Sequence, residues 1–146
     1  MSSVSKVKVV AENKEKFKTV VKVGSFELVF DVPQSLGGDN QGPSPTAGLL
    51  ASLAACIAAV TRLHSNRLGI PVNEVKIEVE GTIDARGLVD DKVPAGFQDI
   101  TVKVIINSPA DLNKLKDLIA IVEKHCPVGY NIKYETPLKV DVVKAG

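Results

Sequence analysis

The chain has 146 residues, of which 45% are apolar and 24% charged, and its formal net charge at pH 7 is +1. This size and composition predict one soluble globular domain over residues 1–146 and exclude a disordered or collagen-like chain. The near-neutral charge, the absence of Trp and the presence of only four Phe and two Tyr argue against a nucleic-acid partner.

The N-terminal part of the chain predicts a β-meander. Charged and apolar residues alternate over Lys6–Val10, and two further strand-like runs cover Phe17–Val23 and Phe26–Val32. Between the last two runs stand Gly24 and Ser25, a pair typical of a two-residue hairpin turn. We therefore expect three strands joined by short connections.

A loop and a long helix follow. The segment Gln34–Pro45 is rich in Gly, Pro and Asn and has no apolar pattern, so it predicts a loop. Ser44 is the expected N-cap with Pro45 at the first helical position, and the helix is expected over Thr46–Leu68. Gly69 is the expected stop signal.

This helix has two different halves. Its first half is Ala-rich and apolar all round, which predicts burial on every side. Its second half carries Arg62, His64, Asn66 and Arg67, which predict that it emerges into solvent. The most apolar run, Ala47–Val60, is too short to span a bilayer, so a buried helix is expected here and no membrane partner.

The C-terminal half predicts two strands, a helix and a last strand. Apolar and charged residues alternate over Val72–Asp84 and again over Ile100–Ile106, which predicts an antiparallel pair joined by a polar loop. A helix is expected to begin with Ser108 as N-cap and to end near His125, before Pro127. Tyr134–Val143 is expected to form the last strand. The order β-β-β-α-β-β-α-β, with strand runs separated by single helices, predicts an α+β fold.

The cysteine count and the N-terminal residues indicate the redox compartment in which the protein is expected. The first ten residues lack the long apolar core of a signal peptide. Two cysteines in a chain of this length do not make a secreted disulfide scaffold. A cytoplasmic location is therefore expected, and there a cysteine pair is more often catalytic, redox-active or simply buried than permanently bridged.

Familiar cofactor and hydrolase motifs are absent from the sequence. It contains no GxGxxG, Walker, HExxH or GxSxG motif. His64, His125, Cys56 and Cys126 are the only His and Cys residues, and none of their spacings gives the local chelate that usually starts a metal site. No metal and no other cofactor is therefore expected.

Cys56 and Cys126 are the residues that can carry chemistry. Cys56 lies in the middle of the apolar helix, where a buried structural cysteine is common. Cys126 follows His125 at a helix end, four positions after Val122 on the apolar face. If two thiols are close in space, one can be oxidised to a sulfenic acid and the other can condense with it to a disulfide, which an outside reductant resets.

The sequence around these cysteines resembles the OsmC/Ohr family, which comprises osmotically inducible protein C and the organic hydroperoxide resistance proteins. The run Gly42–Cys56, GPSPTAGLLASLAAC, is similar to the family's proline-containing loop and Ala-rich helix with the first Cys after "AA". Cys126-Pro127-Val128 is similar to the family's second Cys step. The resemblance extends over nearly the whole chain, since the predicted order of elements also agrees.

The resemblance implies an OsmC-like fold with a long buried central helix, arranged as an intertwined homodimer with its active sites at the subunit interface. It implies a thiol peroxidase in which Cys56 is the peroxidatic thiol and Cys126 the resolving thiol. The implied substrates are organic hydroperoxides, the implied reductant is a dithiol such as a lipoyl group, and no metal or flavin is implied.

Two departures from the family pattern concern activation of Cys56. Thr46 stands ten positions before Cys56, where the family has a glutamate, and no arginine precedes Arg62, whereas the family supplies one from its N-terminal strands. Lys14, Lys16 and Lys18 are the candidate cations from the N-terminal region that could take the place of this arginine. His125 is a possible proton acceptor near the thiols. Arg62 lies about 120° from Cys56 around the helix, too far round to reach that thiol within one subunit, although the same arginine of a second subunit could reach it.

These departures leave three functional hypotheses. The first is the thiol-dependent peroxidase. The second is a non-enzymatic, OsmC-like stress protein that binds a small apolar ligand or senses redox state with the same thiols. The third is an unrelated structural domain with two core cysteines.

Overall fold

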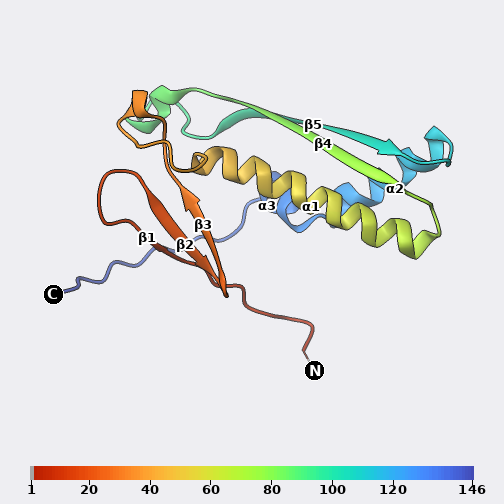
Figure 1. Ribbon diagram of the computed structural model, residues 1–146, viewed down its shortest axis with the longest axis horizontal. Helices are drawn as coiled ribbons and strands as arrows, with labels where there is room; N and C mark the ends of the chain where they lie inside the picture. Colours follow the sequence, from red (N-terminus) through yellow and green to blue (C-terminus); the bar gives the residue numbers. More distant parts are fainter. Residues whose placement is uncertain (1) are drawn as a thin grey trace. The chain divides into compact units, whose positions relative to one another are not determined.

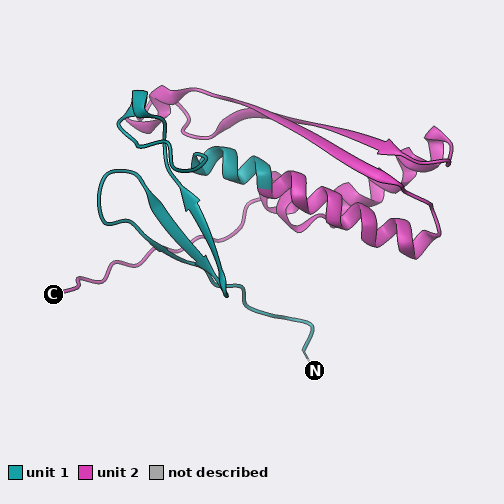
Figure 2. Ribbon diagram, viewed as in Figure 1, with its two compact units in different colours: residues 1–51 teal, residues 52–146 magenta. Residues whose placement is uncertain are grey.

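The computed structural model describes residues 2–146, and the chain forms two compact units (Figure 2). Unit 1 ends at Ala51, and unit 2 is Ser52–Gly146. The elements follow the order β-β-β-α-β-β-α-α, with two short 3₁₀ turns, which confirms the α+β class (Figure 1). That residues 1–146 form one domain stays a prediction.

Unit 1 contains a three-stranded antiparallel sheet of β1 (Val10–Glu12), β2 (Thr19–Val23) and β3 (Phe26–Phe30), in that order. Val23 pairs with Phe26, so Gly24 and Ser25 form the predicted two-residue turn, and Gly24 has a φ of +59°. The first strand is not Lys6–Val10 as expected. Pairing begins at Val10, which lies opposite Lys22, and β2 ends one residue later at Val23, so residues before Val9 have no residue of β2 opposite them.

A single carboxylate orders the loop after β3. Asp31 is buried, and its side chain accepts hydrogen bonds from the backbone amides of Val32 (2.8 Å), Asp39 (3.3 Å) and Gln41 (3.1 Å). Burial by itself would raise the pKa of Asp31, but these three amides outweigh it and lower the pKa below its usual value. The segment that the sequence predicts as irregular is therefore a fixed loop leading to the helix.

Helix α1 (Pro45–Leu68) begins and ends at the predicted signals. Ser44 Oγ accepts a hydrogen bond from the Ala47 amide at 3.2 Å. At the other end, Gly69 has a φ of +67°, and the Ile70 amide donates to the Ser65 carbonyl at 2.9 Å, as in a Schellman ending. The boundary between the two units falls inside this helix (Figure 2).

The predicted burial of α1 on every side is wrong for the described chain. One stripe is buried, comprising Leu53, Ile57, Thr61, His64 and Ser65. The apolar residues Ala47, Leu49, Ala51, Ala55 and Ala59 are exposed. A single chain covers only one side of the helix, so its other apolar side has no cover within the chain. His64 also departs from expectation, since it is buried rather than solvated.

Helix α1 is the one helix among residues 2–146 that is long and apolar enough to cross a membrane by length and composition. The core helix of a soluble protein passes the same test, so this finding is weak evidence for a membrane span. The absence of a membrane partner stays a prediction.

Unit 2 combines a two-stranded sheet with the rest of α1 and two further helices. β4 (Glu74–Ile83) pairs antiparallel with β5 (Phe97–Asn107), as predicted. The 3₁₀ turn Ala85–Leu88 lies in the loop between them. Val75, Ile77 and Val79 of β4 lie opposite Ile106, Val104 and Val102 of β5, so the two strands present a common apolar face.

The core of unit 2 consists of Leu53, Ile57, Leu118, Val122 and Cys126. The last three belong to α2 (Leu112–His125) and its C-cap, and each is at most 1% exposed. Half-buried apolar residues of β4 and β5 pack against this cluster. The helices and the sheet therefore share one core, with Cys126 inside it.

Two predictions about the C-terminal region are wrong. Helix α2 starts at Leu112 with Asp111 as N-cap, because the Ser108 hydroxyl instead donates to the Pro71 carbonyl and accepts from the Ala110 amide in a separate turn. No strand forms over Tyr134–Val143. The chain makes a short helix α3 (Pro127–Lys133) and then continues without a strand partner, leaving the side chains of Leu138, Val140 and Val142 exposed.

Candidate thiol site and its pocket

The two cysteines meet in the core of unit 2. Cys56 lies in the middle of α1, and Cys126 lies between α2 and α3. Cys56 packs against the buried cluster that contains Cys126, and both thiols are free. The fold therefore brings together two thiols that are far apart in the sequence, which is the arrangement that disulfide chemistry requires.

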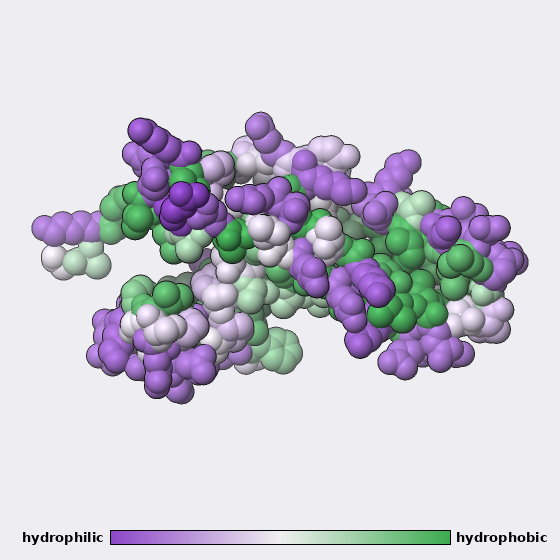
Figure 3. Space-filling view, turned by 90° about the horizontal axis from the view of Figure 1, so that it is seen from above, coloured by the Kyte–Doolittle hydropathy of each residue, from purple (hydrophilic) through white to green (hydrophobic). Residues whose placement is uncertain are grey.

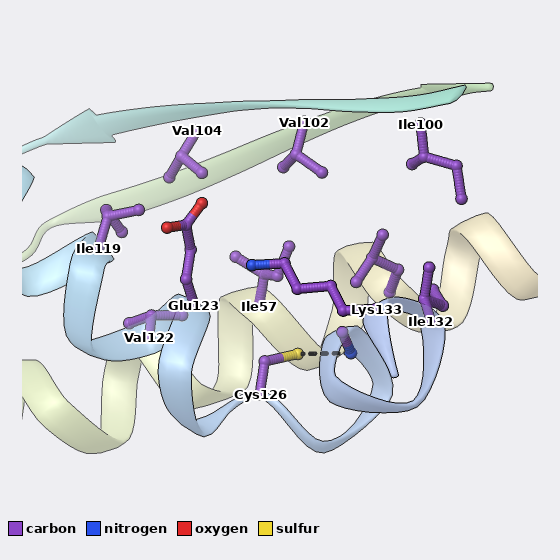
Figure 4. A pocket seen from close by; sticks show the side chains of 12 residues that line it. Ile57, Ile100, Val102, Val104, Ile119, Val122, Glu123, Cys126, Ile132 and Lys133 are labelled. Carbon is purple, nitrogen blue, oxygen red and sulfur yellow. Dashed lines mark hydrogen bonds between the residues drawn. The ribbon is translucent and has the colours of Figure 1, made fainter. Parts of the chain in front are cut away.

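Cys126 is held at a junction of two helices. It is the C-cap of α2, where its amide donates to the Val122 carbonyl at 2.9 Å, and the N-cap of α3, where its Sγ accepts from the Gly129 amide at 3.4 Å (Figure 4). Pro127 at the start of α3 ends α2 and begins the next helix. The sulfur is therefore fixed by backbone on both sides.

The environment of Cys126 disfavours its thiolate. Burial is the main cause that raises the pKa of Cys126 above its ordinary value, and the neighbouring Cys56 thiol raises it further. The Gly129 amide acts in the opposite direction without reversing the shift. Cys126 is 1% exposed, whereas Cys56 is only half-buried. The two thiols thus differ in their access to solvent.

A pocket of about 210 Å³ reaches Cys126 between the three helices and β5 (Figure 4). Its lining includes Cys126 but not Cys56. Eight aliphatic side chains form most of its wall: Leu53, Ile57, Ile100, Val102, Val104, Ile119, Val122 and Ile132. Glu123 and Lys133 are its only charged lining residues, and both side chains extend into the same space (Figure 4).

The sequence analysis missed Glu123 and Lys133. Glu123 lies four residues after Ile119 and next to Val122, so its position beside the apolar face of α2 was visible in the helical spacing. Lys133 gave no comparable signal, because residues 127–133, which form the helix that carries it, were not predicted as any element.

The cations considered as partners of Cys56 have other partners or lie in unit 1. Arg62 donates to the carbonyls of Val72 and Asn73, so it ties the end of α1 to the segment before β4. Lys16 pairs with Asp39 at 3.0 Å. Lys18 is exposed and, together with Lys14, lines a charged hollow within unit 1.

Thr46 also lies in unit 1, where its hydroxyl is 3.1 Å from that of Ser44. Roles for Thr46 and Lys18 at the thiols stay predictions.

His125 contacts a second histidine. The ring centroids of His125 and His64 are 5.4 Å apart, and an Arg67 guanidinium nitrogen lies 3.1 Å from His64 Nδ1. Burial is the main cause that lowers the pKa of His64, and the charges of Arg67 and His125 lower it further. Three basic side chains, those of His64, Arg67 and His125, therefore lie together between the ends of α1 and α2. A role for His125 as a proton acceptor stays a prediction.

This cluster predicts acid sensitivity. Since the pKa of folded His64 is lowered, the unfolded chain binds a proton at His64 more readily than the folded chain does. Stability is therefore expected to fall as pH decreases from the unfolded value of about 6.5 toward the lower folded value. The measurement is Tm at pH 7.5 and 5.5 for the native chain, His64→Gln and His125→Gln. The drop should be smallest in His64→Gln; an equal drop in all three chains would contradict the prediction.

Metal ligands are not assembled in the part of the chain that the structure describes. Residues 2–146 contain no group of three or more His, Cys, Asp or Glu side chains placed to hold a metal ion. The chemistry that this arrangement can perform with its own side chains is that of the two thiols.

Comparison with known proteins gives consistent matches. A family model described as OsmC-like protein matches residues 38–141. A hydroperoxide reductase of Mycoplasma pneumoniae is 29% identical over 102 residues, which is 70% of each chain. The crystal structure of an OsmC-like protein from the same species has a TM-score of 0.78 at 25% identity and covers 88% of each chain. An organic hydroperoxide resistance protein from Legionella pneumophila has a TM-score of 0.69 at 20% identity, covering 90% of this chain and 92% of that one.

Proposed function

The chain belongs to the OsmC-like protein family, and from this premise we propose that it is a thiol-dependent peroxidase that reduces organic hydroperoxides through Cys56 and Cys126. The observation that carries the proposal is that Cys56 packs against the buried cluster of unit 2 that contains Cys126. The similarity to a protein named hydroperoxide reductase supports the choice of substrate.

The proposed cycle has two oxidative steps. The Cys56 thiolate attacks the terminal oxygen of the hydroperoxide, the O–O bond breaks, and an alcohol leaves while Cys56 becomes a sulfenic acid. The Cys126 sulfur then attacks Cys56 Sγ, the S–O bond breaks, and water leaves as the disulfide forms.

The two environments support this division of roles. Half-buried Cys56 is the more accessible sulfur, and buried Cys126, with its raised pKa, stays protonated until a sulfenic acid forms beside it. Aliphatic side chains around both thiols suit an organic rather than a fully hydrated peroxide.

A dithiol such as a lipoyl group is the proposed reductant, in a cytoplasmic setting, and the proposed role in the cell is defence against oxidative stress. No metal, flavin, nucleic acid or membrane is part of the proposal. Thr46, Lys18 and His125 are the weaker candidates for assisting Cys56.

A homodimer belongs to the same proposal. The Ala-rich side of α1 is exposed in the single chain. The tail residues Leu138, Val140 and Val142 alternate like a strand, and their side chains are exposed in the described part of the chain. A second copy would cover both features, and size-exclusion chromatography with light scattering measures whether it does; a monomer at micromolar concentration would contradict the dimer.

The proposed function is tested by following the oxidation of the two thiols. One equivalent of cumene hydroperoxide should convert the native chain to a Cys56–Cys126 disulfide, seen by peptide mapping. In Cys126→Ser, the sulfenic acid on Cys56 should persist and be trapped by dimedone. If dimedone instead labels Cys126 in Cys56→Ser and does not label Cys56 in Cys126→Ser, the peroxidatic and resolving roles are reversed. If neither thiol is oxidised, the peroxidase proposal is refuted.

A binding or redox-sensing role without turnover is the second candidate. It is favoured by Thr46 in place of the family's glutamate and by the lack of any arginine before Arg62. It predicts a ligand that co-purifies in native mass spectrometry together with slow oxidation of Cys56. An empty protein with rapid turnover would exclude it.

A further inference from the structure

We propose that the reductant enters through the pocket beside Cys126 and attacks Cys126 Sγ, while the hydroperoxide reaches Cys56 from elsewhere. This inference rests on the proposed disulfide and its proposed dithiol reductant, and adds to them the binding site of the reductant and the sulfur that is attacked.

The two sulfurs differ in their access from the pocket. Cys126 lines the pocket and Cys56 does not, so a molecule inside the pocket meets Cys126 Sγ first. Cys126 is 1% exposed, which means that its sulfur is reached through this pocket rather than from bulk solvent. A thiol within the pocket therefore attacks the disulfide at Cys126.

The shape and lining of the pocket select the ligand. Its volume of about 210 Å³ is below the roughly 300–1,000 Å³ of pockets for drug-sized molecules. Eight aliphatic side chains line it, so a slim alkyl dithiol fits and a polar tripeptide thiol such as glutathione does not. Glu123 is the only carboxylate in the lining and can take the proton of the entering thiol, while the Lys133 ammonium can attract the resulting thiolate.

The reductive steps balance as two exchanges. The first thiolate forms a bond to Cys126 Sγ, the Cys56–Cys126 bond breaks, and its electron pair stays on Cys56 Sγ. The second thiol of the reductant then attacks the reductant's own sulfur, and Cys126 is released. The reductant loses two electrons and two protons and leaves as a cyclic disulfide, and both protein thiols are restored.

The first experiment identifies the attacked sulfur. The native chain is oxidised with diamide, so the test does not depend on peroxidase activity. It is then mixed with 1-propanethiol for a series of short times, quenched with excess N-ethylmaleimide and mapped by mass spectrometry. The expected result is propanethiol on Cys126 and maleimide on Cys56. Propanethiol on Cys56 in an equal or larger share would overturn the inference and leave the peroxidase proposal intact.

The second experiment fills the pocket. Val102 and Ile105 lie on opposite faces of β5, each is 40% exposed, and only Val102 lines the pocket. Val102→Trp should slow reduction of the disulfide by dihydrolipoic acid about tenfold more than it slows oxidation by cumene hydroperoxide. Ile105→Trp is the matched control and should show no such difference. If the slowing of reduction relative to the slowing of oxidation is equal in the two variants, the inference is overturned.

Discussion

Cys56→Ser is expected to lower kcat/KM for cumene hydroperoxide by about three orders of magnitude or more, since the serine hydroxyl is far less acidic and less nucleophilic than a thiol. The measurement is stopped-flow consumption of the peroxide with dihydrolipoic acid as reductant. Cys126→Ser should instead complete one rapid turnover and then stall, because the sulfenic acid on Cys56 has lost its partner. The two variants therefore separate the oxidative step from its resolution.

A matched control distinguishes loss of the thiol from damage to the helix. Ala58 is half-buried on α1, as Cys56 is, so Ala58→Ser adds a hydroxyl to the same helix without removing a thiol. It should keep most of the activity and a nearly unchanged Tm. Turnover by Cys56→Ser equal to that of the native chain would refute the peroxidatic role of Cys56.

Leu118→Ala is expected to destabilise the fold by about 3 kcal/mol, because Leu118 is completely buried in the core of unit 2 and its truncation leaves a cavity. For a chain of this size, the loss corresponds to a decrease in Tm of roughly 10 °C. Thermal and urea unfolding at a fixed protein concentration measure it, since association would make Tm concentration-dependent.

The control for this substitution lies on the same helix. Leu112 is 65% exposed, so Leu112→Ala should change stability by no more than about 0.5 kcal/mol. Losses of similar size in the two variants would show that the core does not centre on Leu118. The helical spacing places Leu112 on the apolar face of α2 and Leu118 beside it, whereas the structure buries Leu118 and leaves Leu112 exposed.

Elements with strong local signals were predicted close to their observed bounds. The Gly24-Ser25 turn, the Ser44 cap, the Gly69 ending and the alternation in β4 and β5 all agree with the structure. Each of these depends on residues within a few positions of one another, so the chain itself contains the whole signal.

Predictions that needed a distant partner failed more often. Tyr134–Val143 alternates like a strand, but a strand forms only where another strand pairs with it, and none among residues 2–146 does so. Helix α2 begins later than expected because Ser108 bonds to the Pro71 carbonyl, a contact across more than thirty residues. The apolar composition of α1 predicted burial, but composition does not say which sides a single chain can cover.

By itself, the sequence determined the α+β class, the identity of the two thiols and, through resemblance, their assignment to one site. Only the tertiary structure decided that Cys126 is the buried sulfur of the pair, that a narrow aliphatic pocket leads to it, and that Glu123 and Lys133 line that pocket. The physical reason is that caps, turns and periodicity act between near neighbours. Burial and pocket lining depend on which distant segments pack together, and so does the pKa of Cys126.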